Sequence, residues 1–210
     1  MNACGRTGAA MAGCVVLLAL AAIGVNRASA YPPAVGVLSA SKDCLACHLN
    51  NGPWKVESDV IIDILDKATG RSLRQADGTF LIAARRGELK TVLTIIGSRA
   101  RPGTPAPYRN AWLYVDPARI ADSSSLNKFA PGWAVNLPMS CRVVGDVVAS
   151  YPGDHTTALP MTVRAGEDAP RETEMELQVM LTRGESVKAK PKEGMQGSYF
   201  RRTVRFRVET

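Results

Sequence analysis

The pentapeptide Cys44-Leu45-Ala46-Cys47-His48 constrains this chain more than any other feature, because it brings two thiols and an imidazole into five residues. Cys-x-x-Cys-His is the attachment signature of c-type haem. With five cysteines and two histidines in 210 residues, a chance match is improbable. We therefore expect one covalently attached haem c, bound through Cys44 and Cys47, with His48 as the proximal iron ligand. His48 is expected to donate its second ring nitrogen to a nearby carbonyl, such as that of Gly52 or Pro53.

Two other interpretations of Cys44 and Cys47 fit the surrounding sequence less well. A redox Cys-x-x-Cys normally lies within a βαβ pattern, which is absent here. A zinc site needs a second pair of ligands, and His155 with Cys141 is a poor candidate for that pair.

The first 30 residues predict an export signal. Arg6 supplies a positive charge, an apolar run covers residues 15–23, and Ala28-Ser29-Ala30 forms a small-x-small cleavage site. The run is too short for a comfortable membrane span. We expect cleavage after Ala30 and a mature protein in the periplasm or another extracytoplasmic compartment, without a stable membrane span.

The mature chain is mildly basic. Cleavage removes Arg6 and Arg27, which lowers the formal net charge from +7 to +5. Such a charge is compatible with docking to an acidic redox partner protein. The chain has no basic stretch interleaved with aromatic residues, so a nucleic-acid partner is not expected.

Counting cysteines singles out Cys141. Cys4 and Cys14 leave with the signal, and haem would occupy Cys44 and Cys47, so Cys141 is an unpaired exported thiol. It is either the distal haem ligand, where the iron would lower the pKa of the thiol, or a buried apolar thiol. The residues alone leave both roles open.

The sixth iron ligand has other candidates besides Cys141. His155 lies in a turn sequence, where histidines are usually solvated. Methionines can ligate haem iron but more often fill gaps in a core. The five candidates are Met139, Met161, Met175, Met180 and Met195. Water is the remaining possibility.

Hydrophobic spacing predicts one helix near the motif. Val60, Ile61, Ile64 and Leu65 recur at helical spacing after Ser58, a plausible N-cap. Gly70 ends the run. We predict a helix over 58–69.

Downstream of the predicted helix, the spacing of apolar residues changes to the period typical of β-strands. Segments 80–85 and 89–96 flank Arg86-Gly87-Glu88 and predict a hairpin. Further strands are predicted over 111–115, 140–149, 159–164, 174–181 and 200–208. In the last two, apolar residues alternate with charged ones, which fits antiparallel sheets with one wet face. The acidic face around Glu174 and Glu176 is expected to pair with arginines of the final strand.

The predicted fold is therefore mostly β: a short helical haem-binding N-terminal segment followed by an antiparallel β-sandwich. We divide the chain into a signal peptide (1–30), a haem-binding segment with the Cys-x-x-Cys-His motif (31–75) and a β-sandwich domain (76–210). The chain ends in a strand, which distinguishes it from the all-helical small cytochromes c.

The sequence resembles the small monohaem cytochromes c of the NaxL/NaxS type, found as a heterodimer in anammox bacteria and with relatives elsewhere. The resemblance covers nearly the whole mature chain. It is carried by Cys44-Leu45-Ala46-Cys47-His48, Asn51-Gly52-Pro53-Trp54, Trp112-Leu113-Tyr114-Val115-Asp116-Pro117, Ala130-Pro131-Gly132-Trp133, Cys141-Arg142-Val143-Val144-Gly145-Asp146 and the tail from Leu159-Pro160-Met161. It implies a haem ligated by His48 and Cys141, binding of NO or CO when the distal thiolate gives way, and a homologous haem subunit as partner in a hetero- or homodimer.

Three functions follow from these expectations. The first is a redox or gas-responsive haem protein with His48/Cys141 ligation. The second is a six-coordinate electron-transfer cytochrome, and the third is a haem subunit of a larger periplasmic oxidoreductase complex. An enzymatic role of its own is not expected, because the chain has two histidines and no recognisable acid–base pair.

Overall fold

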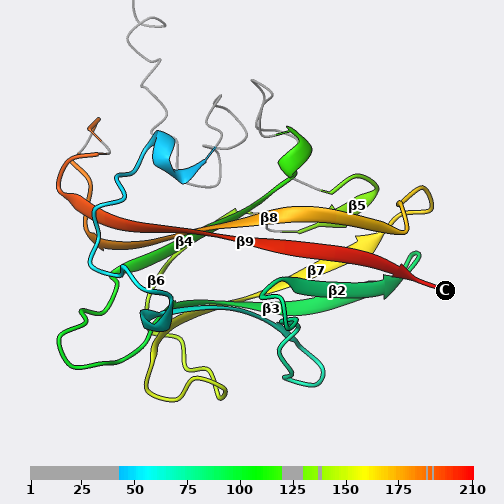
Figure 1. Ribbon diagram of the computed structural model, residues 1–210, viewed down its shortest axis with the longest axis horizontal. Helices are drawn as coiled ribbons and strands as arrows, with labels where there is room; N and C mark the ends of the chain where they lie inside the picture. Colours follow the sequence, from blue (N-terminus) through cyan, green and yellow to red (C-terminus); the bar gives the residue numbers. More distant parts are fainter. Residues whose placement is uncertain (1–42, 120–129, 137–138, 188, 191) are drawn as a thin grey trace, which may run out of the picture. The chain divides into compact units, whose positions relative to one another are not determined.

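Two β-sheets packed face to face form the body of the described part of this protein (Figure 1). The computed structural model describes residues 43–119, 130–136, 139–187, 189–190 and 192–210, which belong to one compact unit. The predicted signal peptide and residues 31–42 lie outside the described residues.

The four-stranded sheet has the order β1 (Val60–Asp66), β3 (Leu89–Ser98), β7 (His155–Ala165) and β5 (Trp133–Val135). The five-stranded sheet has the order β2 (Phe80–Arg85), β9 (Met195–Glu209), β8 (Glu172–Gly184), β4 (Arg109–Val115) and β6 (Met139–Val143). Three short 3₁₀ turns complete the elements of the described residues: η1 (Cys44–Ala46), η2 (Glu57–Asp59) and η3 (Pro117–Arg119). None of the helices in the described part of the chain is long and apolar enough to cross a membrane.

The predicted mostly-β sandwich is confirmed. All strand pairs are antiparallel except β2 with β9, which is parallel. The alternation predicted for the last two strands is also correct: Met175, Leu177, Val179 and Val204 are fully buried in the core between the sheets. Burial of one face on each sheet supplies the main stabilisation, at ~25 cal/mol per Å² of apolar surface.

The helix predicted over 58–69 is wrong, because this segment forms η2 and the strand β1. β1 pairs with β3 along its whole length and belongs to the sandwich. Its inward side chains Ile62 and Ile64 join the main core, while Ile61 and Leu65 join a second cluster on the outer face. A run of β-branched residues buried on both faces favours a strand over a helix. The helical spacing was a by-product of this nearly continuous apolar run.

The hairpin predicted over 80–96 is also wrong. β2 lies in the five-stranded sheet and β3 in the four-stranded sheet, so Arg86-Gly87-Glu88 connects the two layers. Gly87 has a φ of 73° and donates its N–H to the carbonyl of Ala165. Arg86 donates to the carbonyls of Gly166 and Glu167. These long-range bonds to the end of β7 turn the chain from one sheet to the other.

The strand predicted over 140–149 is shorter, because β6 ends at Val143. Gly145 and Asp146 then donate their N–H groups to the carbonyl of Thr156 on β7. This places Val148 and Tyr151 against the second apolar cluster on the outer face of the four-stranded sheet. The strand predicted over 159–164 lies within β7.

Candidate functional site

The single 3₁₀ turn η1 shapes the Cys-x-x-Cys-His motif. The Asp43 carboxylate caps the turn by accepting the N–H of Ala46 at 3.1 Å. The N–H groups of Cys47 and His48 both donate to the carbonyl of Cys44, at 3.2 and 3.0 Å. These two bonds to one carbonyl fold the motif into a single tight turn, which holds both thiols and the imidazole close together.

The residues after the motif are hydrogen-bonded to the first part of β9, along the edge that β2 does not cover. β2 pairs only with residues 204–209 of that strand. Asn50 and Asn51 accept the N–H groups of Tyr199 and Gly197 through their side-chain oxygens, at 3.0 and 3.2 Å. Gly52 donates its N–H to the Gly197 carbonyl. The approach is so close that a Cβ atom on Gly52 would lie 2.5 Å from Ser198 Oγ. This attachment fixes where the motif sits on the five-stranded sheet.

Trp54 continues the chain into the space between the sheets. Its side chain is 1% exposed and belongs to the main core, and its Nε1 donates to the carbonyl of Pro105 at 3.0 Å. The N-terminal segment therefore passes from the outer face of the five-stranded sheet, around the edge of β9, into the interior.

The motif lies over the outer face of the five-stranded sheet (Figure 1). Cys44 Sγ is 3.9 Å from Oε1 of Gln178 on β8. Gln178 Nε2 donates in turn to Glu176 Oε1 at 2.8 Å, and Arg201 lies 3.5 Å from the same carboxylate. Gln178 is only 1% exposed, so the wet face predicted for this strand is wrong at the point where the motif covers it.

Cys141 lies on the same outer face as the motif. It is the register partner of Ala111 on β4, which is the partner of Met180 on β8, which is the partner of Tyr199 on β9. Val179 and Leu181 face the core between the sheets, so Met180, which lies between them on β8, faces outward. Register partners project to the same side of a sheet, and Cys141 therefore faces outward as well. Cys141 and Met180 are separated by two strand spacings, about 10 Å.

The neighbouring row on this face contains Met139, Leu113 and Gln178. The sheet thus brings together the motif, Cys141 and two of the candidate methionines, Met139 and Met180. It separates Met161, Met175 and His155 from this face. Met161 and Met175 are fully buried in the core between the sheets, and His155 begins β7 in the opposite sheet. Met195 stands at the first position of β9.

The electrostatics keep His48 neutral. Burial lowers the pKa of its imidazole, and a neutral imidazole is the form that ligates a metal. Its Nδ1 atom is buried and has no hydrogen-bond partner in the structure. The prediction that the carbonyl of Gly52 or Pro53 accepts a bond from His48 is wrong for the geometry described.

The three cysteines of the described chain are free thiols. Burial raises the pKa of Cys44 to about 12, with the nearby Asp43 carboxylate adding to the effect. Burial also raises the pKa of Cys141, and the Arg109 guanidinium partly offsets this. None of these three thiols forms a disulfide, so each is available to bind a ligand.

This donor set fits a covalently attached haem. Cys44 and Cys47 are free to form thioether bonds, and His48 offers a neutral imidazole with an unpartnered buried nitrogen. Within the described ranges, no three His, Cys, Asp or Glu side chains gather into a separate metal-binding cluster. Sequence analysis missed Gln178, Glu176 and Tyr199 as neighbours of the motif. Strand alternation alone assigns Gln178 and Glu176 to a solvated face, and Tyr199 lies just before the predicted final strand.

No family model matches the sequence, and no curated protein matches it. The solved structures with similarity include WR4, an MSP family member from C. elegans, at 11% identity and a TM-score of 0.32, over 61% of this chain and 92% of that chain. They also include the ASH/PapD-like domain 7 of human CEP192, at 8% identity and a TM-score of 0.31, over 75% of this chain and 92% of that chain. Similarity at this level does not bear on function.

Proposed function

We propose that this protein is an exported monohaem c-type cytochrome that acts in one-electron redox chemistry and binds NO or CO. Cys44 and Cys47 would hold the haem covalently, His48 would be the proximal ligand, and Cys141 the distal ligand. The haem would supply a one-electron couple and, at a vacated iron position, a binding site for a diatomic gas.

The observation that carries this proposal is the position of Cys141 relative to the motif. One helical turn presents Cys44, Cys47 and His48 over the outer face of the five-stranded sheet, and Cys141 belongs to that face. A half-buried thiol on the edge strand β6 would suit an exchangeable ligand. Burial raises the pKa of this thiol, and the nearby Arg109 guanidinium partly offsets that rise.

The protein's own residues have three tasks in this proposal. Asp43 caps the turn that aligns the thiols. Asn50 and Asn51 hold the segment after His48 against β9. Gln178 and Glu176 form a polar floor under Cys44. None of these groups forms an acid–base pair of the kind that catalysis requires, so we propose a redox or binding role and not an enzymatic one.

A stably six-coordinate electron carrier is the second candidate. Its supporting observation is that Met139 and Met180 share the outer face with Cys141. A thioether ligand would raise the reduction potential relative to a thiolate. The same haem site would also serve in a subunit of a larger periplasmic complex, with a homologous haem subunit or another redox protein as partner.

The deciding experiment is to record absorption and EPR spectra of the purified ferric protein beside Cys141→Ala. Thiolate ligation predicts a low-spin spectrum with a narrow spread of g values, which the substitution abolishes. Met139→Leu and Met180→Leu are matched controls on the same face and should leave the spectrum unchanged. If Cys141→Ala leaves it unchanged and one methionine variant alters it, the plain electron carrier is favoured. A protein without covalent haem would reject both candidates.

A further inference from the structure

A basic hollow lies beside the motif at one end of the five-stranded sheet. It is formed where β8 ends and β9 begins, and its volume is about 440 Å³. Its lining residues are Asn51, Arg183, Gly184, Lys192, Gly194, Met195 and Gln196. Asn51 follows His48 by three residues and is bound through its side-chain oxygen to Gly197. The hollow and the motif are therefore parts of one surface.

The positive charge of this hollow is not neutralised by the described residues. Arg183 and Lys192 are both exposed, and neither forms an ion pair with a carboxylate in the described ranges. The carboxylates closest in the chain are already engaged: Glu185 pairs with Arg109 at 3.5 Å, and Glu193 pairs with Lys190 at 3.1 Å. Two cations in a concave surface attract an external anionic group.

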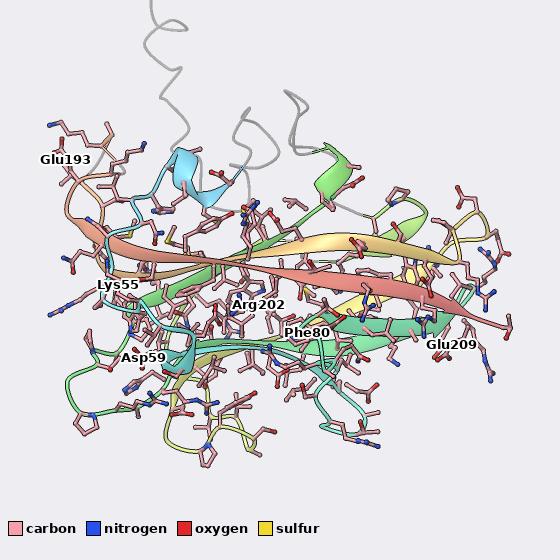
Figure 2. All side chains as sticks on the ribbon, in the orientation of Figure 1. Lys55, Asp59, Phe80, Glu193, Arg202 and Glu209 are labelled. Atoms are coloured by element: carbon pink, nitrogen blue, oxygen red, sulfur yellow. The ribbon has the colours of Figure 1, made fainter. Side chains whose placement is uncertain are left out.

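A second arginine-lined hollow offers an internal comparison. It contains Arg85, Arg86 and Arg171, has a volume of about 390 Å³, and includes the Glu209 carboxylate in its lining. It lies where β8 begins and β9 ends, whereas the basic hollow lies at the opposite ends of these strands. Figure 2 shows Glu193 and Glu209 at opposite ends of the ribbon. A 13-residue strand separates the hollows by about 40 Å, several Debye lengths at physiological salt.

We propose that the basic hollow docks carboxylate side chains of an acidic redox partner protein, next to the proposed haem site. This inference rests on the proposed function for the identity of the partner. The guanidinium of Arg183 can donate two parallel hydrogen bonds to one carboxylate, and the ammonium of Lys192 can pair with a second carboxylate beside it. Charge pairs of this kind at the rim of a site act mainly on the association rate and on its salt dependence. Docking here would bring the partner to the edge of the haem motif.

The test uses a fluorescein-labelled decaglutamate peptide and the full purified chain, with binding measured by fluorescence anisotropy at low and at physiological salt. The test variant is Arg183→Glu with Lys192→Glu. The control variant is Arg85→Glu with Arg171→Glu, which makes the same change in net charge in the distant hollow. All four residues are exposed, and thermal unfolding of each variant checks that the fold is retained.

We expect the test variant to weaken peptide binding about tenfold or more at low salt, and the control variant to weaken it less than about twofold. Equal losses in both variants would mean that only net charge matters and would overturn the proposal. Absence of binding by the wild type, or binding unaffected by the test variant, would also overturn it.

Covalent haem is assayed separately by haem staining after denaturing electrophoresis. Peptide binding at the basic hollow without haem would reject the proposed function and keep the docking site. Haem without selective peptide binding would reject the docking site and keep the proposed function.

Discussion

Cys44 and Gln178 are 134 positions apart in the chain, and Cys44 Sγ lies 3.9 Å from Gln178 Oε1. This contact joins the Cys-x-x-Cys-His turn to the central strand of the five-stranded sheet. Gln178 is almost completely buried although its neighbours on β8 that share its face include the acidic Glu174 and Glu176. The motif therefore has a defined resting position on the sheet.

Replacement of Gln178 by alanine should expose Cys44. In the haem-free protein with Cys47 and Cys141 changed to serine, we expect Cys44 to react with a maleimide about fivefold faster, since a net hydrogen bond contributes ~1 kcal/mol. The measurement is the labelling rate under native conditions. Gln196→Ala, at an exposed glutamine, should leave the rate unchanged. Equal rates in the wild type and Gln178→Ala would show that this contact does not hold the turn.

Haem attachment should depend on Cys44 and Cys47 and not on Cys141. After co-expression with a haem-attachment system, the Cys44→Ala/Cys47→Ala variant should show no haem stain on a denaturing gel. Cys141→Ala should stain like the wild type, because a distal ligand is not a covalent bond to the porphyrin. A stained band from the double variant would contradict the assignment of the two attachment sites.

Stability of the haem-free protein should fall as the pH is lowered below about 6.5. Burial lowers the pKa of His48 in the folded state, while an unfolded histidine titrates near ~6.5. Below that value the unfolded chain binds more protons than the folded one, so protonation favours unfolding. Melting temperatures across this range measure the effect, and His48→Gln should flatten the curve. His155→Gln, the same change at the other histidine, should preserve it.

Tyr151→Phe should destabilise the fold by ~1–3 kcal/mol, because it removes a hydrogen bond to a buried carboxylate. The Tyr151 hydroxyl donates to Asp63 Oδ2 at 2.6 Å, and Asp63 is 4% exposed. Ser72 supplies the other hydroxyl donor, at 2.6 Å. Urea unfolding midpoints measure the difference. Tyr108→Phe, at a tyrosine that is 40% exposed, should change stability by less than ~0.5 kcal/mol. A similar loss in both variants would argue against a special role for the Asp63 bond.

Local sequence pattern predicted an element correctly where that pattern is compatible with only one kind of secondary structure. Alternation over β8 and β9 predicted two strands with a buried face, because their period of two matches only an extended chain with one side in the core. The mostly-β sandwich followed from several such segments. The expected pairing between the acidic face and the final strand is present as Arg201 with Glu176. Arg207 pairs instead with Glu172, which precedes the predicted strand.

Prediction failed where the same sequence pattern is compatible with two different structures. The apolar run at the start of β1 suits a helix by its spacing, yet it is buried on both faces in a sheet. Segments 80–85 and 89–96 resemble a hairpin, yet each finds its partners far away in the chain. The packing of the whole domain decides which distant strands pair. The spacing of residues within a short segment carries no information about that pairing.

The sequence by itself determined which reactive groups the motif contains, because Cys44, Cys47 and His48 lie within one turn of adjacent residues. Only the tertiary structure decided which side chains meet that motif. It placed Cys141, Met139 and Met180 on the same sheet face as the motif, and it left Met161, Met175 and His155 elsewhere. The reason is physical: the face on which a strand residue lies depends on its register with distant strands, and one step in register reverses it.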